Sequence, residues 1–272
     1  MRGIAARRSL GFAAVAVLGI AFSGRMHTSA AAPRQQPSQN ATAARNWTPP
    51  DPATIPEGPL GDSIRLGLRV FDDTPQSAAP YVGNKMSCGH CHAGSGTLAG
   101  AIPLVGVPGL FPMYRKRENA VVTFEERIQQ CFQRSENGHR LPSGSPQMVG
   151  LVAYAQWLSK GQVSGQPFPG RGLVALPALT GNPQRGGKIY AQTCVKCHGA
   201  DGAGTPPTFP PLWGPGAYNT GAGMNRISTM AAFVRQNMPQ DAPGSLTAQQ
   251  AYDVAVYVHS KPHTPFDIRD HR

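Results

Sequence analysis

Four of the five cysteines in this 272-residue chain fall in two Cys-x-x-Cys-His motifs, Cys88–His92 and Cys194–His198. Two thiols at this spacing can form thioethers with the vinyl groups of a haem, and the adjacent histidine can bind the iron. A zinc site would need motifs that converge on one ion, and a thioredoxin-like motif does not require the histidine. The sequence therefore predicts two covalently bound haem c groups. The expected attachment residues are Cys88, Cys91, Cys194 and Cys197, and the expected iron ligands are His92 and His198.

The fifth cysteine, Cys131, has no attachment role in these motifs. It follows His92 by 39 residues, and Met238, in an Asn-Met-Pro segment, follows His198 by 40 residues. The repeat thus places a sulfur atom at equivalent positions in both halves, which predicts the axial pairs His92/Cys131 and His198/Met238. Thiolate and thioether ligands give the iron different potentials. Alternative ligands are Met224 and Met230 in the second half and Met113 and His139 in the first. Burial as a small apolar residue is the alternative role of Cys131.

Cys131 lies in a segment with the start and stop signals of a helix. Thr123 and Glu126 have the spacing of a capping box at a helix N-terminus. Asn137-Gly138 is typical of a helix end. The pattern predicts a helix over residues 123–138.

A cation and a hydroxyl should share the helix face of Cys131. Arg127, Cys131 and Ser135 recur every four residues, which places them on one side of a helix. Together with the unpaired thiol they indicate an anion-binding site beside a haem. The sequence leaves open which of the nearby cations face that site: Arg115, Lys116, Arg117 or Arg140.

Helical patterns flank both haem motifs. Residues 63–73 and 187–192 precede the motifs, and helices capped at Ser145-Pro146 and Thr247 close the two halves. The 32 glycines and 27 prolines indicate many loops. We expect a mainly α fold with two cytochrome c-like domains in tandem, each with one covalent haem.

The first 32 residues have the features of a secretory signal peptide. Arg2, Arg7 and Arg8 precede an apolar run over residues 10–22, and small residues follow up to Ala32. The run of 13 residues is too short for a comfortable membrane span. We therefore expect a periplasmic protein with no membrane span in the mature chain.

The net charge limits the classes of partner. It is +11 for the whole chain, and loss of four arginines with the signal peptide leaves +7. A basic surface attracts anions or acidic proteins. Export, and the lack of a Lys/Arg run longer than residues 115–117, argue against nucleic acid.

Four segments have a distinctive sequence beyond these spacings. They are the first haem motif followed by Ala-Gly, and residues 103–107, 111–119 and 126–138. Together they resemble the dihaem thiosulfate dehydrogenases, over residues 60–265. Members of that family couple two thiosulfate ions into tetrathionate.

The resemblance implies that the first haem, with His92 and the Cys131 thiolate as axial ligands, forms the active site. It also implies that Arg117, Arg127 and Ser135 bind the anionic substrate, and that the second haem passes electrons onward. Some relatives have a lysine before the distal methionine and exchange ligands there. This chain has Asn237 at that position, so we expect Met238 to stay bound.

The expected boundaries follow from these features. They are a signal peptide (1–32), a flexible leader (33–58), an N-terminal cytochrome c domain with the active-site haem (59–160), a linker (161–183), a C-terminal cytochrome c domain with the electron-transfer haem (184–265) and a tail (266–272).

The expected reaction is 2 S₂O₃²⁻ → S₄O₆²⁻ + 2 e⁻, with Cys131 as the catalytic nucleophile. Thiosulfate forms a cysteine–sulfur adduct, and a second thiosulfate then releases tetrathionate. Fixed cations offset the repulsion between the two dianions. The expected electron acceptor is a small cytochrome, and the sequence leaves the favoured direction open.

Two other functions remain as alternatives. One is the cysteine-ligated cytochrome of a multi-protein sulfur-oxidation pathway, and the other is a plain dihaem electron carrier. A dihaem peroxidase is disfavoured because the paired sulfur ligands leave no open iron position.

Overall fold

The computed structural model describes residues 47–271. The predicted signal peptide and residues 33–46 of the predicted leader lie outside this range. Among the described residues, no helix has the length and apolar character needed to cross a membrane. The first half contains η1 (Pro52–Thr54), α2 (Pro59–Asp72), α3 (Thr74–Ser77), η2 (Ala79–Tyr81), α4 (Cys88–Cys91), α5 (Ala93–Gly96), η3 (Pro108–Leu110), β1 (Met113–Arg115), β2 (Ala120–Val122), α6 (Phe124–Arg134) and α7 (Pro146–Leu158). The second half contains α8 (Pro183–Ile189), the π-helical turn η4 (Tyr190–Cys194), α9 (Val195–His198), η5 (Gly223–Asn225), α10 (Ile227–Asn237), α11 (Ala248–His259) and η6 (Ile268–His271).

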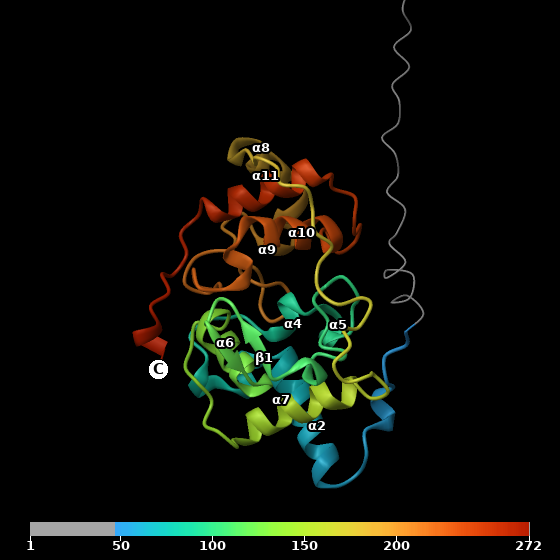
Figure 1. Ribbon diagram of the computed structural model, residues 1–272. Helices are drawn as coiled ribbons and strands as arrows, with labels where there is room; N and C mark the ends of the chain where they lie inside the picture. Colours follow the sequence, from blue (N-terminus) through green and yellow to red (C-terminus); the bar gives the residue numbers. More distant parts are fainter. Residues whose placement is uncertain (1–46, 272) are drawn as a thin grey trace, which may run out of the picture. The chain divides into compact units, whose positions relative to one another are not determined.

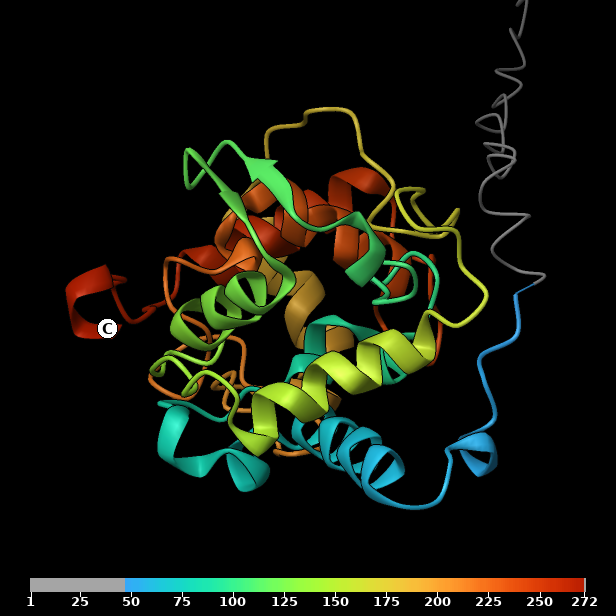
Figure 2. The ribbon, with the colours of Figure 1, turned by 60° about the horizontal axis from the view of Figure 1, so that its bottom comes forward.

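The frame of the first half is the packing of α2 against α7, which lie side by side in Figure 2. The helices approach closely at Gly67 and Gly150, where a Cβ on Gly67 would overlap the carbonyl oxygen of Gly150. About one turn after these glycines, Val70 of α2 and Tyr154 of α7 are buried. The predicted N-cap of α7 is present, because Ser145 Oγ accepts a hydrogen bond from the backbone of Met148 at 3.3 Å.

The second half repeats this arrangement with α8 and α11 (Figure 1). Gly186 of α8 lies so close to α11 that a Cβ would overlap the carbonyl oxygen of Asp253. The Asp253 carboxylate also accepts hydrogen bonds from Arg185 at 2.7 and 2.8 Å. From α8 the chain continues through η4 and α9 to His198 without leaving helical geometry. The first helix of this half thus delivers the haem motif directly, as the sequence predicts.

Side-chain amides join the two halves of the described chain. Asn84 Nδ2 donates to the carbonyl oxygens of Ser135 at 2.8 Å and Ala217 at 3.0 Å. Asn237 Nδ2 donates to the carbonyl of Gly100 at 3.1 Å. Residues 266–271, predicted as a tail, pack back onto the first half, where Gln133 Nε2 donates to the carbonyl of His271 at 2.7 Å. The cavities of the two halves are therefore held in a fixed relation.

The capping box predicted at α6 is wrong in one of its two hydrogen bonds. Thr123 Oγ1 accepts from the backbone N–H of Glu126 at 3.1 Å, as predicted. The Glu126 carboxylate, however, accepts two hydrogen bonds from Arg140, at 2.8 and 2.6 Å. A bidentate charged pair is stronger than a hydrogen bond to one backbone N–H. The Glu126 carboxylate therefore pairs with Arg140 and not with the backbone of Thr123.

Two helix limits and one hairpin also differ from the expectation. The first helix begins at Pro59 rather than at residue 63, because proline is favoured in a first turn. Helix α6 ends at Arg134, before the predicted stop signal. Strands β1 and β2 form an antiparallel hairpin that the sequence analysis did not predict.

The α2–α7 approach gives a test of the fold. Replacing Gly67→Ala should lower the free energy of unfolding by about 2 kcal/mol, because the helices must separate to admit the methyl group. Chemical denaturation followed by circular dichroism measures this. Gly216→Ala is the control, since the nearest atom that its Cβ would meet is Pro211 Cγ at 3.4 Å. Equal stability of the two variants would contradict the close approach.

Candidate functional site

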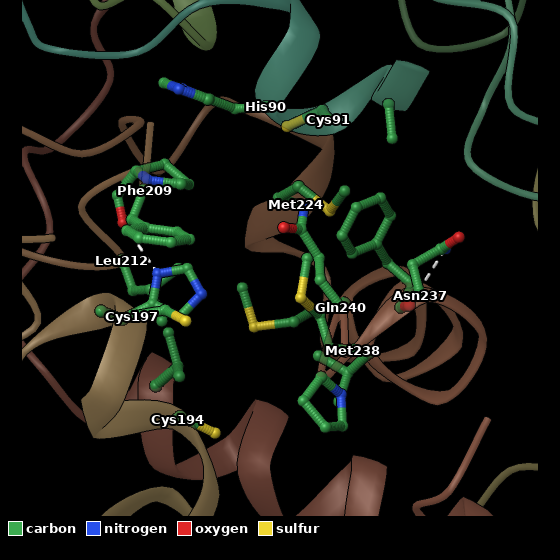
Figure 3. Close-up of a pocket in the computed structure, with 18 of the residues that line it drawn as sticks. His90, Cys91, Cys194, Cys197, Phe209, Leu212, Met224, Asn237, Met238 and Gln240 are labelled. Carbon is green, nitrogen blue, oxygen red and sulfur yellow. Dashed lines mark hydrogen bonds between the residues drawn. The ribbon is translucent and has the colours of Figure 1, made fainter. Parts of the chain in front are cut away.

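A cavity of about 620 Å³ lies in the second half, around the second Cys-x-x-Cys-His motif. Cys194 and Cys197 lie on one side of it, and Met224 and Met238 lie on the facing side (Figure 3). The remaining wall is mostly apolar and includes Met230. A cavity of this size, with two thiols on one wall and thioethers opposite, fits a covalently bound haem.

The two predicted proximal histidines, His92 and His198, each form a hydrogen bond from Nδ1 to a backbone carbonyl. His198 Nδ1 pairs with the carbonyl oxygen of Pro210 at 2.9 Å, and His92 Nδ1 pairs with that of Ile102 at 2.5 Å. A carbonyl can only accept, so Nδ1 carries the proton and Nε2 keeps a free lone pair. Burial also lowers the pKa of His198, which favours the neutral ring that a metal needs. Both rings therefore fit the role of haem ligand.

A second cavity, of about 370 Å³, lies in the first half. Arg127, Cys131 and Ser135 all line it, so these three residues share one face of α6 as predicted. Cys88, Cys91 and His92 line it as well. The predicted attachment thiols, the proximal histidine and the unpaired cysteine thus meet in one space.

The sulfur of Cys131 is held by a cation. Arg127 Nη1 donates to Cys131 Sγ at 2.9 Å. Burial alone would raise the pKa of this thiol, but the charge of Arg127 and its hydrogen bond to the sulfur outweigh burial and lower the pKa to about 7, with the neighbouring His92 ring adding to the effect. Burial instead raises the pKa of Cys91 to about 12, with Glu136 adding to the effect. Cys131 is therefore far more readily a thiolate than Cys91.

Some of the other predicted cations and alternative iron ligands line a cavity, and others do not. Arg115 lines the first cavity, whereas Arg117 does not, because its Nη2 donates to the carbonyl oxygen of Gly221 at 2.9 Å. Arg140 is paired with Glu126 outside the cavity. The alternative ligands Met113 and His139 line neither cavity, whereas Met224 and Met230 line the second one with Met238.

Sequence reasoning missed two residues of the first cavity. Glu136 is 1% exposed, lines the cavity and has one oxygen without a hydrogen-bond partner among the described residues. Arg171, from the predicted linker, lines it too. Arg171 reaches the cavity only through the tertiary fold, so no local pattern marks it. Glu136 follows Ser135 at the end of α6, where its backbone N–H donates to the Cys131 carbonyl at 3.1 Å, but a four-residue helical spacing from Cys131 does not select it.

The two cavities share part of their walls. Met86 and Cys91 line both of them. Met86 is 3% exposed, so it fills the space between the cavities rather than facing solvent. Groups bound in the two cavities would consequently be close neighbours.

Comparisons with known proteins agree with this arrangement. Residues 78–163 match the family "SoxA/TsdA, cytochrome c domain", and residues 181–258 match "Cytochrome C oxidase, cbb3-type, subunit III". A thiosulfate dehydrogenase of Allochromatium vinosum is 44% identical over 230 residues, which cover 80% of this chain and 85% of the relative. The chain belongs to the thiosulfate dehydrogenase family. A thiosulfate dehydrogenase of Thiomonas intermedia is 39% identical over 259 residues, covering 91% of this chain and 82% of that one.

A solved structure of the thiosulfate dehydrogenase family is similar in fold. The "as isolated" form of thiosulfate dehydrogenase (TsdBA) from Marichromatium purpuratum matches with a TM-score of 0.76 and 40% identity. The match covers 83% of this chain and 51% of the other, so this chain spans about half the length of that protein. The predicted mainly α fold with two cytochrome c domains and covalently bound c-type haem is confirmed.

Haem attachment in the first half can be counted directly. The double substitution Cys88→Ala/Cys91→Ala should lower the mass of the intact holoprotein by one haem beyond the change in side chains, because no thioether remains to hold it. Mass spectrometry under denaturing conditions measures this. Cys131→Ala serves as the control and should keep both haems. Loss of a haem in the control, or none in the double variant, would contradict the assignment of the thiols.

Proposed function

We propose that this chain oxidises two thiosulfate ions to tetrathionate, with Cys131 as the nucleophile in the first cavity. The observation that supports it most strongly is the 2.9 Å hydrogen bond from Arg127 to Cys131 Sγ, beside the lone pair of His92. A low-pKa sulfur held by a fixed cation suits an anionic sulfur substrate. Family membership favours an enzyme over a plain electron carrier.

The residues of each haem-binding pattern are assigned here by what they would hold. In the first half, Cys88 and Cys91 would attach the haem, and His92 and Cys131 would bind its iron. In the second half, Cys194 and Cys197 would attach the haem, and His198 and Met238 would bind its iron. When bound, each haem iron accepts one electron. Met224 and Met230 belong to the buried core, whereas Met238 packs against that core at the cavity wall, which favours Met238 as ligand.

Asn237 supports the same choice of ligand. Its Nδ2 donates to the carbonyl oxygens of Phe233 and Gly100, both at 3.1 Å. These two bonds fix the backbone next to Met238. An amide also cannot replace a methionine at iron as a neutral lysine amine could, so Met238 has no competitor at the adjacent position.

The proposed reaction forms two S–S bonds in succession, and neither step takes up or releases a proton. In the first, the Cys131 sulfur and the outer sulfur of thiosulfate form an S–S bond, and two electrons leave. In the second, the outer sulfur of another thiosulfate attacks the sulfur bound to Cys131 and forms tetrathionate, while the electron pair of the broken bond returns to Cys131 as thiolate. Arg127 stabilises that thiolate, and the Ser135 hydroxyl donates to an oxygen of the bound anion. Arg117 adds positive charge that opposes the repulsion between the two dianions.

The location and the electron acceptor are part of the proposal. The N-terminal segment favours export, and covalently bound c-type haem suits the periplasm. The wall that the cavities share at Met86 and Cys91 would give electrons a short path from a haem in the first cavity to one in the second. A small cytochrome would then accept the electrons from the second half.

The nucleophile can be tested by substitution. Cys131→Ala should abolish tetrathionate formation while both haems stay attached, because no sulfur is left to carry the adduct. The assay measures tetrathionate with an artificial electron acceptor and no carrier protein. Full activity of the variant would overturn the adduct scheme. If the unmodified enzyme forms no free tetrathionate in this assay, and a product linked to a carrier protein appears only when a carrier is added, the multi-protein pathway is supported instead.

A further inference from the structure

A loop of the second half lies against the helix that carries Cys131. In this loop, residues 219–226, Asn219 Nδ2 donates to the carbonyl of Gln133 and to Asn137 Oδ1, both at 2.9 Å. Asn219 Oδ1 accepts from the backbone N–H of Gly221, also at 2.9 Å. The loop is therefore fixed to the C-terminal end of α6. Any side chain that it carries has a defined position next to the first half.

Two arginines meet at this loop from opposite halves. Arg117, between β1 and β2, donates from Nη2 to the Gly221 carbonyl at 2.9 Å. Arg226 Nη2 lies 3.8 Å from the position that a side chain on Gly223 would take, so its guanidinium lies over the same loop. Burial lowers the pKa of Arg117, and the charges of Arg134, Arg226 and Arg127 lower it further. Arg117 and Arg226 therefore both lie at residues 221–223 of this loop.

The ion pairs of this region involve other arginines. Glu118, which lies near Arg117, pairs with Arg134 at 3.0 Å and Arg115 at 3.4 Å. Across residues 47–271, no ion pair joins Arg117, Arg127 or Arg226 to an acid. Gathering unpaired guanidinium groups costs free energy through their repulsion. A dianion bound among them removes that cost.

The geometry points to an anion subsite that Arg226 and Arg117 form outside the first cavity. We propose that it binds a dianionic sulfur oxyanion through its sulfonate group, and that its occupant is the second thiosulfate of the reaction. This inference rests on the proposed function. A guanidinium presents paired N–H donors that match two sulfonate oxygens. Arg127, which lines the cavity, then continues the positive path from the subsite to Cys131.

Through this subsite, the second half of the chain contributes a substrate-binding residue to the reaction at Cys131. Arg226 lies in the cytochrome domain that holds the electron-transfer haem, yet it serves the chemistry at Cys131. The subsite holds the second thiosulfate near the adduct. No bond forms or breaks at Arg226 itself, and the sulfur–sulfur exchange stays as described for Cys131.

Steady-state kinetics of the holoenzyme test this role. Arg226→Gln should raise KM for thiosulfate about tenfold, the effect of losing a hydrogen bond to a charged group, and change kcat less than twofold. It should also weaken the dependence of kcat/KM on ionic strength, since screening then acts on one fewer cation. Arg65→Gln is the matched control, because it removes the same charge from an arginine that pairs with Glu57 and Asp62 on the α2 side. Arg226→Lys should restore the salt dependence but not the full affinity.

Binding without turnover separates this inference from the proposed function. Thiosulfate titrated calorimetrically into holoprotein carrying Cys131→Ala should bind about tenfold more weakly once Arg226→Gln is added. Adding Arg65→Gln instead should leave the affinity unchanged. Equal affinity in the two double variants overturns the subsite, whether or not the unmodified protein makes tetrathionate. Absence of tetrathionate from the unmodified holoenzyme overturns the proposed function alone.

Discussion

A thiolate in an apolar cavity is costly unless a cation or a metal lies beside it. The first cavity meets this requirement at Cys131, whose sulfur accepts a hydrogen bond from Arg127 at 2.9 Å. Because the arginine stands four residues before the cysteine on α6, the helix itself sets their separation. The substrate-binding face, the iron ligand and the nucleophile of the proposed function all depend on this one pair.

The rest of the fold keeps that pair in relation to the second haem. The close crossings at Gly67 and Gly186 hold each motif-bearing segment against its closing helix. Asn84, Asn219 and Asn237 join the halves through backbone carbonyls. Their result is a wall common to both cavities at Met86 and Cys91. Electrons taken at the first cavity therefore have a short route to the second.

Local chemistry explains which parts of the site the sequence predicts. Haem attachment is encoded within five residues, so both motifs are recognisable without a fold. The common face of Arg127, Cys131 and Ser135 follows from helical periodicity alone, and all three line the first cavity. Helix caps such as Ser145 and Thr247 are local in the same sense.

Contacts between distant segments could not be predicted in this way. Arg171 reaches the first cavity through tertiary packing, and Arg226 comes from the other half of the chain. The capping box failed for the same reason, since Arg140 competes for the carboxylate of Glu126 from outside the local window. The hairpin β1–β2 has three-residue strands, too short for an alternating pattern.

The central claim is that the Cys131 sulfur is a thiolate at the first haem. Low-temperature electron paramagnetic resonance of the oxidised holoprotein tests it most directly, because thiolate-ligated and thioether-ligated low-spin haems give different signals. We expect one signal of each kind. Two signals of the histidine–methionine kind, with none from thiolate ligation, would contradict the account.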